Sequence, residues 1–269
     1  YVYLHHSLAS THMIYRSEAF DNFDSILCVG PHHLAEIKAR ETLYNLPCKE
    51  LVQHGYGKLD ALMASGQLGP RKQNSSDALQ VLIAPSWGEN GLLELFADEV
   101  IESLLKVNCN IIVRPHPRTF HFKPDLKFHL LDSFGNNKNF QLDLDSNSFD
   151  SFYSSDIMIS DWSGAALEFG FGLERPIIFV DVPKKILNSK YQELEIEPLE
   201  VQIRDQIGIV LSTKDISEIG EVAKKLGKSK NDWQTKVAEA RSRWVYNIGN
   251  SGGVAAKFLM SYIQEKDKI

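Results

Sequence analysis

Short apolar runs alternate with longer amphipathic stretches along most of this chain. Runs bounded by Gly, Pro, Ser, Asp or Asn predict buried strands, and the amphipathic stretches between them predict helices. Strands that alternate with helices indicate a mostly parallel sheet with helices on both faces, so we expect an α/β fold. The expected strands lie at residues 1–4, 25–29, 50–53, 79–84, 111–114, 128–131, 140–142, 157–159, 208–211 and from Ile177 onward. The expected helices follow Gly30-Pro31 and Ser163, and lie at 92–107, 216–226, 231–245 and 254–264.

One stretch interrupts this alternation. Residues 66–77 combine Gly, Pro, Ser, Asn and Gln with charges and little apolar content, which predicts a linker. A second break, at Gly252-Gly253, comes before the last helix. We therefore expect a first section over residues 1–65, a second section over 78–246, and a terminal helix within 247–269.

The most informative stretch is residues 156–181. An apolar strand runs into Ser160-Asp161-Trp162-Ser163-Gly164, a helix carrying Glu168 follows, and a second buried strand starts at Ile177, which together predict one βαβ unit. The loop places Ser163 and Gly164 at a helix N-terminus, where backbone N–H groups and the helix dipole favour a bound phosphate. The alternative is that Asp161 or Ser163 is a plain N-cap.

Two further polar loops follow apolar strands. In Arg114-Pro115-His116-Pro117 the two prolines stiffen the loop, and arginine beside histidine suits anionic oxygen; the alternative is a rigid turn with a solvated arginine. In Ala84-Pro85-Ser86-Trp87 we expect the serine to face the same cleft as the Arg114 loop. Trp87 is better explained as a core residue than as a side chain that packs against a nucleobase. Ligands of such sheets bind at the carboxyl ends of strands, where these loops gather.

A histidine pair follows the first expected strand, in His5-His6-Ser7. An unperturbed histidine, with a pKa of about 6.5, suits proton removal at neutral pH, so a histidine at this strand end is a candidate general base. The alternative is a surface histidine pair near a chain terminus.

Composition narrows the function classes. The net charge of -6 and the pI of about 5.9 give no basic excess that would favour nucleic acid. No apolar run approaches the roughly 20 residues of a membrane span. The three cysteines are scattered without CxxC spacing, which predicts reduced thiols of a cytoplasmic protein.

Two further expectations concern what the chain holds and where it begins. No histidine or carboxylate set has metal-ligand spacing, so we expect no metal and no cofactor. The chain starts at Tyr1 inside an expected strand, so we expect an N-terminal segment to precede it.

Taken together, these loops resemble the CDP-glycerol glycerophosphotransferase family, which includes teichoic-acid polymerases and primases. The resemblance runs from residue 1 to about 182 and thins afterwards. The residues that carry it are His6-Ser7; Tyr15, Phe20 and Asp24; Cys28-Val29-Gly30-Pro31-His32-His33; Gly55-Tyr56 with Leu59-Asp60; Ala84-Pro85-Ser86-Trp87; Arg114-Pro115-His116-Pro117; and Ser160-Asp161-Trp162-Ser163 with Glu168 and Pro176-Ile177-Ile178-Phe179.

The resemblance implies a GT-B-like fold, with two Rossmann-like domains, parallel sheets and a cleft between the domains. It implies that residues 1–65 are an incomplete acceptor-side domain and that 78–246 bind the nucleotide donor. The helix in 247–269 then packs back toward the first domain. One departure concerns the family motif Trp-His-Gly-Thr, where this chain has His5-His6-Ser7-Leu8: His6 matches the histidine, but the glycine and threonine are replaced.

The implied reaction is attack by an acceptor hydroxyl on the β-phosphorus of CDP-glycerol, or of a related CDP-polyol, with release of CMP. His6 takes the hydroxyl proton and His116 donates to the leaving phosphate. Donor binding is expected from Ser86, Arg114, Asp161, Ser163 and Gly164, with Glu168 at the ribose. The acceptor is a cell-envelope polymer or a lipid-linked molecule, so the expected location is cytoplasmic, peripheral to the inner face of the cell membrane.

Two other functions stay open at this stage. A GT-B glycosyltransferase that uses a nucleotide sugar shares the phosphate site and differs in the sugar pocket. A degenerate domain that only binds a nucleotide or a partner keeps the fold without the reaction.

Overall fold

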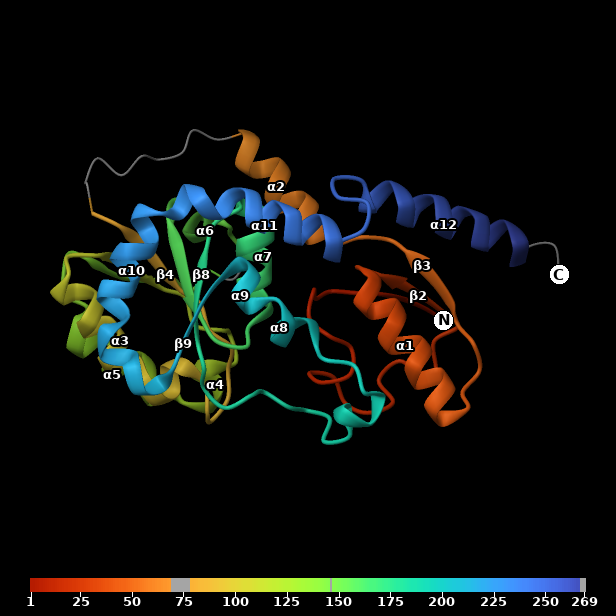
Figure 1. The fold of residues 1–269 in the computed structure, drawn as a ribbon, viewed down its shortest axis with the longest axis horizontal. Coiled ribbons are helices and arrows are strands. Elements are labelled where there is room, and N and C mark those ends of the chain that lie inside the picture. The colour runs from red at the N-terminus through yellow and green to blue at the C-terminus, as the bar shows by residue number, and fades with distance from the viewer. Residues whose placement is uncertain (69–77, 146, 267–269) are drawn as a thin grey trace. The chain divides into compact units, whose positions relative to one another are not determined.

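The computed structural model describes residues 1–68, 78–145 and 147–266, and the chain divides into two compact units (Figure 1). Unit 1 consists of Tyr1–Leu68, Lys185–Gln202 and the chain from Glu239 onward. Unit 2 consists of Gly69–Lys184 and Ile203–Ala238. Both contain parallel sheets joined by helices, which confirms the predicted α/β fold.

Unit 1 is built on a three-stranded parallel sheet in the order β1-β2-β3. The strands are β1 Val2–Leu4, β2 Ser25–Cys28 and β3 Glu50–Gln53. The central strand β2 is buried along its whole length, and Ile26 and Cys28 pack with Phe20 and Ile37 in a hydrophobic cluster. The helices of this unit are α1 Pro31–Tyr44, α2 Gly57–Leu68, η1 Tyr191–Leu194, α8 Leu199–Gln202 and α12 Ser251–Lys266.

Helix α1 begins where the sequence predicts it. Pro31 occupies the first turn, where its fixed φ suits a helix and its missing N–H leaves no bond unmade. The preceding Gly30 has no room for a side chain, because a Cβ there would lie 1.9 Å from the carbonyl oxygen of Trp244. The helix ends at Asn45 in the left-handed conformation, with φ of 51°.

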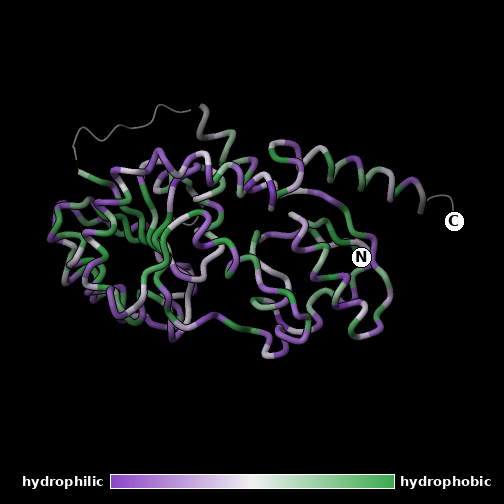
Figure 2. The backbone as a smooth tube through the Cα atoms, viewed as in Figure 1, coloured by the Kyte–Doolittle hydropathy of each residue, from purple (hydrophilic) through white to green (hydrophobic). Residues whose placement is uncertain are grey.

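Unit 2 contains a six-stranded, all-parallel sheet in the order β6-β5-β4-β7-β8-β9. The strands are β4 Gln80–Ile83, β5 Asn110–Val113, β6 Phe140–Leu142, β7 Ile157–Ser160, β8 Ile177–Val180 and β9 Gly208–Leu211. Strands β4, β7 and β8 are buried throughout, as expected for strands covered on both faces, and Figure 2 shows the hydrophobic residues concentrated in them.

Helices connect these strands. They are α3 Leu92–Lys106, α4 Thr119–Phe122, α5 Pro124–Phe134, α6 Asp150–Ser154, α7 Gly164–Leu173, α9 Arg204–Ile207, η2 Thr213–Glu218 and α10 Ile219–Lys228. Helix α11, Lys230–Trp244, begins in unit 2 and ends in unit 1. Within the described ranges, no helix combines the length and apolarity needed to cross a membrane.

The strand predicted at 128–131 is wrong, because this segment belongs to helix α5. Its buried residues are Leu126, Leu130 and Phe134, which recur every four positions and form one face of a helix. Phe128 is instead 70% exposed, so the local apolar run misrepresents the periodicity. The other expected strands occur at or close to their expected ranges.

The two units follow different boundaries from the sections expected from the sequence. The expected linker starts at Gly66, whereas α2 continues to Leu68; residues 69–77 lie outside the described residues. The segment Lys185–Gln202 belongs to unit 1, because the N–H groups of Leu187 and Asn188 both donate to the carbonyl of Met13. The terminal helix α12 also groups with unit 1.

Candidate functional site

The sheet of unit 2 brings three predicted loops to one edge. Strand β4 lies between β5 and β7, and Ile83 is in register with Val113 on one side and Ile159 on the other. The chain therefore leaves all three parallel strands at the same level, as expected for the carboxyl edge of a sheet. Ser86, His116 and Ser163 follow these three strand ends.

Asp161 ties two of these loops together. Its side chain is 1% exposed, and its two carboxylate oxygens accept the backbone N–H groups of Ser86, at 2.6 Å, and Leu92, at 3.1 Å. Leu92 is the first residue of α3, so the carboxylate also faces the positive end of that helix. The sequence predicted a donor-binding role for Asp161; in the structure both of its oxygens are engaged in positioning the loop that carries Ser86.

The N-terminus of α7 is reachable from solvent. Ser163 caps the helix, with its Oγ accepting the N–H of Ala165 at 3.2 Å, so the N-cap alternative considered from the sequence is realised. Ser163, Gly164 and Ala165 are only half-buried. Glu168, one turn further along, is buried. This helix end retains the dipole and orientation that suit a phosphate.

His116 presents a defined ring nitrogen. Its Nδ1 lies 3.1 Å from the backbone nitrogen of Arg118. A backbone N–H only donates, so Nδ1 is the acceptor and the neutral ring carries its proton on Nε2. This tautomer is able to donate a hydrogen bond to an anionic oxygen through Nε2, the role that the sequence predicted for His116.

A cation–aromatic stack, formed by Trp87, Arg118 and Phe122, adjoins His116. The Trp87 ring lies 6.0 Å from the His116 ring, stacks on Phe122 at 5.3 Å and is covered by the Arg118 guanidinium at 4.0 Å. Trp87 is half-buried rather than a core residue, and Phe122 is 58% exposed. The sequence analysis did not identify Arg118 or Phe122, because only the short turn of α4 brings them to Trp87.

Arg114 points toward the loop between β6 and α6. Its Nη1 donates to the Ser148 carbonyl and the Ser151 hydroxyl, each at 2.7 Å, and lies 3.4 Å from Asp143. The side chain is 12% exposed. These contacts assign Arg114 to holding that loop in place, and its contact with a donor phosphate stays a prediction.

In unit 1, the two adjacent histidines differ sharply. His6 is exposed, with its Nδ1 3.0 Å from the Tyr3 hydroxyl and its backbone carbonyl accepting the Tyr56 hydroxyl at 2.8 Å. His5 is buried against His33, with ring centroids 4.0 Å apart. Burial, reinforced by the neighbouring histidines, holds the pKa of His5 well below its usual range, so this residue stays neutral. Of the pair, only His6 is accessible for proton transfer.

The segment that follows His6 is held by buried side chains along its length. This pinned segment, Leu8–Met13, is buried although it forms no helix or strand. His32 and His33 donate from Nε2 to the carbonyls of Leu8 and Ala9, each at 2.9 Å. Burial lowers the pKa of both histidines, that of His32 to about 3, so both remain neutral donors.

Two buried carboxylates also hold the pinned segment through hydrogen bonds. Glu200 accepts the N–H and hydroxyl of Ser10, at 2.8 and 2.7 Å, and Glu36 accepts the N–H and hydroxyl of Thr11, both at 2.6 Å. Glu36 also lies 3.4 Å from His12. Burial alone would raise the pKa of Glu36, but the pKa falls to about 2, and the hydrogen bond to His12 is the largest of the effects that lower it. The sequence analysis assigned none of these residues a role, because each partner is remote in the sequence.

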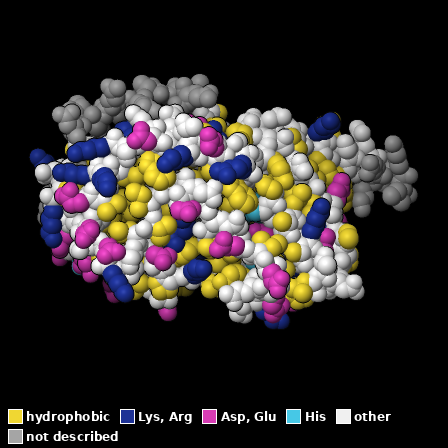
Figure 3. All heavy atoms as spheres, in the orientation of Figure 1, with side chains coloured by type: hydrophobic (Ala, Val, Ile, Leu, Met, Phe, Trp, Pro, Cys, Tyr) yellow, Lys and Arg dark blue, Asp and Glu magenta, His cyan; other side chains and the backbone are white. Residues whose placement is uncertain are grey.

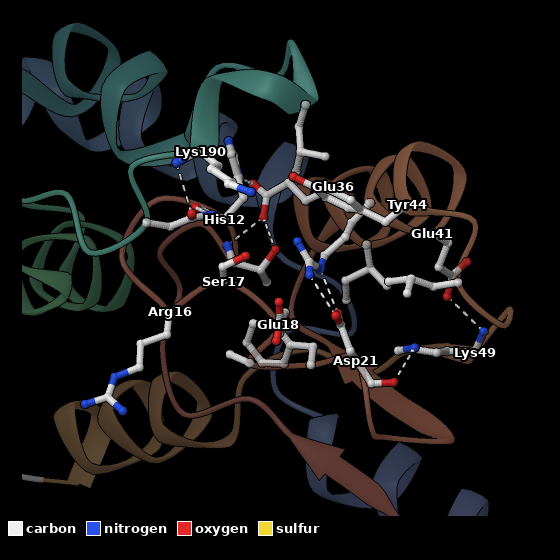
Figure 4. Close-up of a pocket in the computed structure, with 18 residues that line it drawn as sticks. His12, Arg16, Ser17, Glu18, Asp21, Glu36, Glu41, Tyr44, Lys49 and Lys190 are labelled. Carbon is white, nitrogen blue, oxygen red and sulfur yellow. Dashed lines mark hydrogen bonds and ion pairs between the residues drawn. The ribbon is translucent and has the colours of Figure 1, made fainter.

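Unit 1 also contains a cavity between the loop 11–21, helix α1 and residues 188–194 (Figure 4). It encloses about 490 Å³ of empty space, counting its open mouth. Its polar side chains largely satisfy one another: Arg40 binds Asp21 through two nitrogens at 2.7 Å, and His12 faces Glu36. No residue predicted for the site lines this cavity, so we place the candidate site elsewhere.

Charge adds little to this picture. On the face drawn in Figure 3, the basic and acidic side chains of the described residues are interspersed. In the part of the chain that the structure describes, no group of three or more His, Cys, Asp or Glu residues is placed to hold a metal ion. The predicted site residues belong to two sets: His6 lies in unit 1, and all the others lie in unit 2.

Several solved structures share this fold. The wall teichoic acid polymerase TagF matches 100% of this chain and 69% of its own at 16% identity, with a TM-score of 0.63. A histidine-to-asparagine variant of TagF soaked with CDPG matches 91% of this chain and 57% of its own at 20% identity, with a TM-score of 0.57. UDP-GlcNAc 2-epimerase from Neisseria meningitidis, bound to UDP-GlcNAc, matches 93% of this chain and 68% of its own at 15% identity, with a TM-score of 0.57. These likenesses show a GT-B-like fold.

Sequence comparison shows the family. No curated protein sequence matches the chain significantly. The profile of one family does match, over residues 6–193, which include the expected site residues from His6 to Glu168. This match spans more than half of the chain, and the chain therefore belongs to the CDP-Glycerol:Poly(glycerophosphate) glycerophosphotransferase family.

Proposed function

We propose that this protein transfers glycerol phosphate, or a similar polyol phosphate, from a CDP-activated donor to a hydroxyl group of a cell-envelope polymer or lipid-linked acceptor. The observation that carries this proposal is the edge of the unit 2 sheet. There Asp161 ties the β4 and β7 loops, and His116 offers an Nε2–H group from the β5 loop. Family membership supports the reaction class.

In the proposed reaction, an oxygen of the acceptor hydroxyl attacks the β-phosphorus of the donor. The bond from that phosphorus to the bridging oxygen breaks, and CMP leaves with the bridging oxygen. The hydroxyl proton passes to His6, and the Nε2–H of His116 donates to the charge that develops on the leaving phosphate. Such transfer depends mainly on positioning and charge stabilisation, which fixed loops supply.

Donor binding is assigned to unit 2. The N-terminus of α7, at Ser163 and Gly164, takes a phosphate, and Glu168 reaches the ribose. Ser86 and Arg114 contact the donor phosphates from the adjacent loops, while Asp161 holds the Ser86 loop in place. An envelope acceptor would place the reaction at the inner face of the cell membrane.

The test measures release of CMP when the protein is supplied with CDP-glycerol or CDP-ribitol, and release of UDP when it is supplied with UDP-GlcNAc, together with calorimetric binding of each donor. We expect His6→Ala and His116→Ala each to lower transfer by about 10² or more, the scale of a lost general base or hydrogen-bond donor. His6→Ala should leave donor affinity nearly intact, whereas His116→Ala should weaken it. Full activity in either variant would remove that residue's role.

A matched control is His129→Ala, because His129 is exposed on α5 and its Nε2 contacts the carboxylate of Asp98. Buried histidines such as His12 and His33 are unsuitable controls, since each holds the pinned segment or its neighbours. Turnover of UDP-GlcNAc, without turnover of either CDP donor, would instead favour a nucleotide-sugar glycosyltransferase. This alternative is worth testing because the chain shares its fold with an epimerase that binds UDP-GlcNAc.

A further inference from the structure

Tyr3 and Tyr56 hold His6 at two different points. The Tyr56 hydroxyl donates to the His6 backbone carbonyl at 2.8 Å and so fixes the main chain. The Tyr3 hydroxyl lies 3.0 Å from Nδ1 and so contacts the ring itself. The side chain of His6 is otherwise exposed, and an exposed ring that lacks such a contact samples several rotamers.

Tyr3 is well placed to act as a fixed anchor. It lies in β1, paired with Ile26 of the buried strand β2. Its ring packs edge-on against Phe20, with centroids 5.1 Å apart, and at a tilt against Phe23, with centroids 4.9 Å apart. Burial raises the pKa of Tyr3, so its hydroxyl stays neutral. A neutral phenol can either donate or accept a hydrogen bond.

The direction of the bond follows from the chemistry once His6 gains a proton. Both nitrogens of an imidazolium carry hydrogen, so Nδ1–H then only donates, and the Tyr3 oxygen is the acceptor beside it. Two other side chains adjoin this ring: the Tyr15 ring lies 5.9 Å from the His6 ring, and His5 interacts electrostatically with His6. Because Nδ1 is hydrogen-bonded to the Tyr3 hydroxyl, Nε2 is the ring nitrogen that can take a proton from an acceptor hydroxyl.

We propose that Tyr3 is the positioning residue of His6: its hydroxyl orients the ring and accepts the Nδ1–H of the imidazolium formed when Nε2 takes the acceptor proton. The role in turnover rests on the proposed function; the orientation of the ring does not. The alternative is that Tyr3 serves only to pack against the rings of Phe20 and Phe23. Tyr3→Phe separates the two, because it keeps the packed ring and removes only the oxygen.

The kinetic test compares Tyr3→Phe with Tyr1→Phe, a control in which the same atom is lost from a residue that is 85% exposed. Removal of a hydrogen bond to a charged group predicts a fall in kcat of about 10- to 100-fold, with the KM for the donor unchanged. Tyr1→Phe should match the wild type. A purely packing role predicts that Tyr3→Phe has wild-type kcat, and that result would overturn the proposal. Thermal unfolding of Tyr3→Phe should match the wild type, which shows that the fold is intact.

The second test needs no transferase activity. In ¹⁵N-histidine-labelled protein at a pH that protonates exposed histidines, we expect a His6 Nδ1–H signal protected from exchange, assigned by its loss in His6→Asn. The signal should disappear in Tyr3→Phe and persist in Tyr1→Phe. A signal that persists in Tyr3→Phe, or is absent from the wild type, would overturn the assignment of Tyr3. If the wild type shows the expected signal but transfers nothing from any CDP donor, the proposed function fails while the orientation of His6 by Tyr3 stands.

Discussion

The sharpest structural prediction concerns Asp161, which joins two loops of the unit 2 site. The perturbation is Asp161→Ala, which removes both carboxylate oxygens without adding bulk. In the wild type these oxygens accept the N–H groups of Ser86 and Leu92 at 2.6 and 3.1 Å. With the carboxylate removed, two backbone donors in a buried region have lost their partner.

The magnitude follows from these two bonds. A buried donor that loses its partner costs about 1–3 kcal/mol, so two of them predict a loss of about 2–6 kcal/mol in the free energy of unfolding. The lower half of that range applies if water enters the space left by the carboxylate. Asp161→Asn keeps one acceptor oxygen and turns an NH₂ group toward a backbone donor, so it should fall between the wild type and Asp161→Ala.

The assay is urea unfolding, followed by calorimetric binding of CDP-glycerol under conditions where the variant is folded. We expect Asp161→Ala to unfold at lower urea with an unchanged m value, and to bind the donor more weakly because the Ser86 loop is released. Asp132→Ala, an exposed carboxylate of α5, serves as the control and should lie within about 0.5 kcal/mol of the wild type. Unchanged stability in Asp161→Ala would show that the carboxylate does not hold the loops after β4 and β7 together.

Three further predictions address other parts of the structure. The pKa of Glu36 is lowered to about 2, so its contribution to stability is present above about pH 4.5 and is lost as the pH falls toward 2. The pKa of its partner His12 is raised, so the contribution of the pair is present below about pH 6.5 and is lost as the pH rises through the raised pKa of His12. The advantage of the wild type over Glu36→Gln in urea unfolding should therefore peak between about pH 4.5 and 6.5, and an advantage that does not vary with pH would contradict the ion pair. Arg114→Ala removes the contacts to Ser148 and Ser151, so amide exchange at residues 147–151 should accelerate by about tenfold or more, whereas unchanged exchange would show that these residues do not depend on Arg114. Gly30→Ala forces a Cβ to within 1.9 Å of the Trp244 carbonyl and should cost about 2 kcal/mol or more in unfolding free energy, while Gly252→Ala, which meets nothing within 4 Å, should cost far less.

Much of the fold was predictable because its strands are short, apolar and bounded by turn residues. β4, β7 and β8 are buried along their whole length, so their sequences are nearly continuous apolar runs. Helix α5 was missed because its local run Phe128-His129-Leu130-Leu131 contains only one buried residue, Leu130. A run of four residues does not distinguish a strand from one turn of a helix when the buried face is unknown.

The candidate site was predictable only as a set of loops. Parallel strands bring their carboxyl ends to one edge, so Ser86, His116 and Ser163 were expected near one another from the order of the chain. The use of each polar group was not predictable in this way. Asp161 and Arg114 are engaged with main-chain and side-chain partners in neighbouring loops, a choice set by register and side-chain direction.

By itself, the sequence determined the α/β class, the positions of most strands and helices, and the polar loops at the strand ends, because each depends on the periodicity and turn chemistry of a few consecutive residues. The tertiary structure alone decided that the segment after His6 is buried and held by side chains remote in the sequence. Ser10 reaches Glu200 across 190 positions, and Leu8 and Ala9 each reach a histidine 24 positions away. Such pairs leave no local pattern, because a buried carboxylate or histidine is stable only beside partners that folding brings from distant parts of the chain.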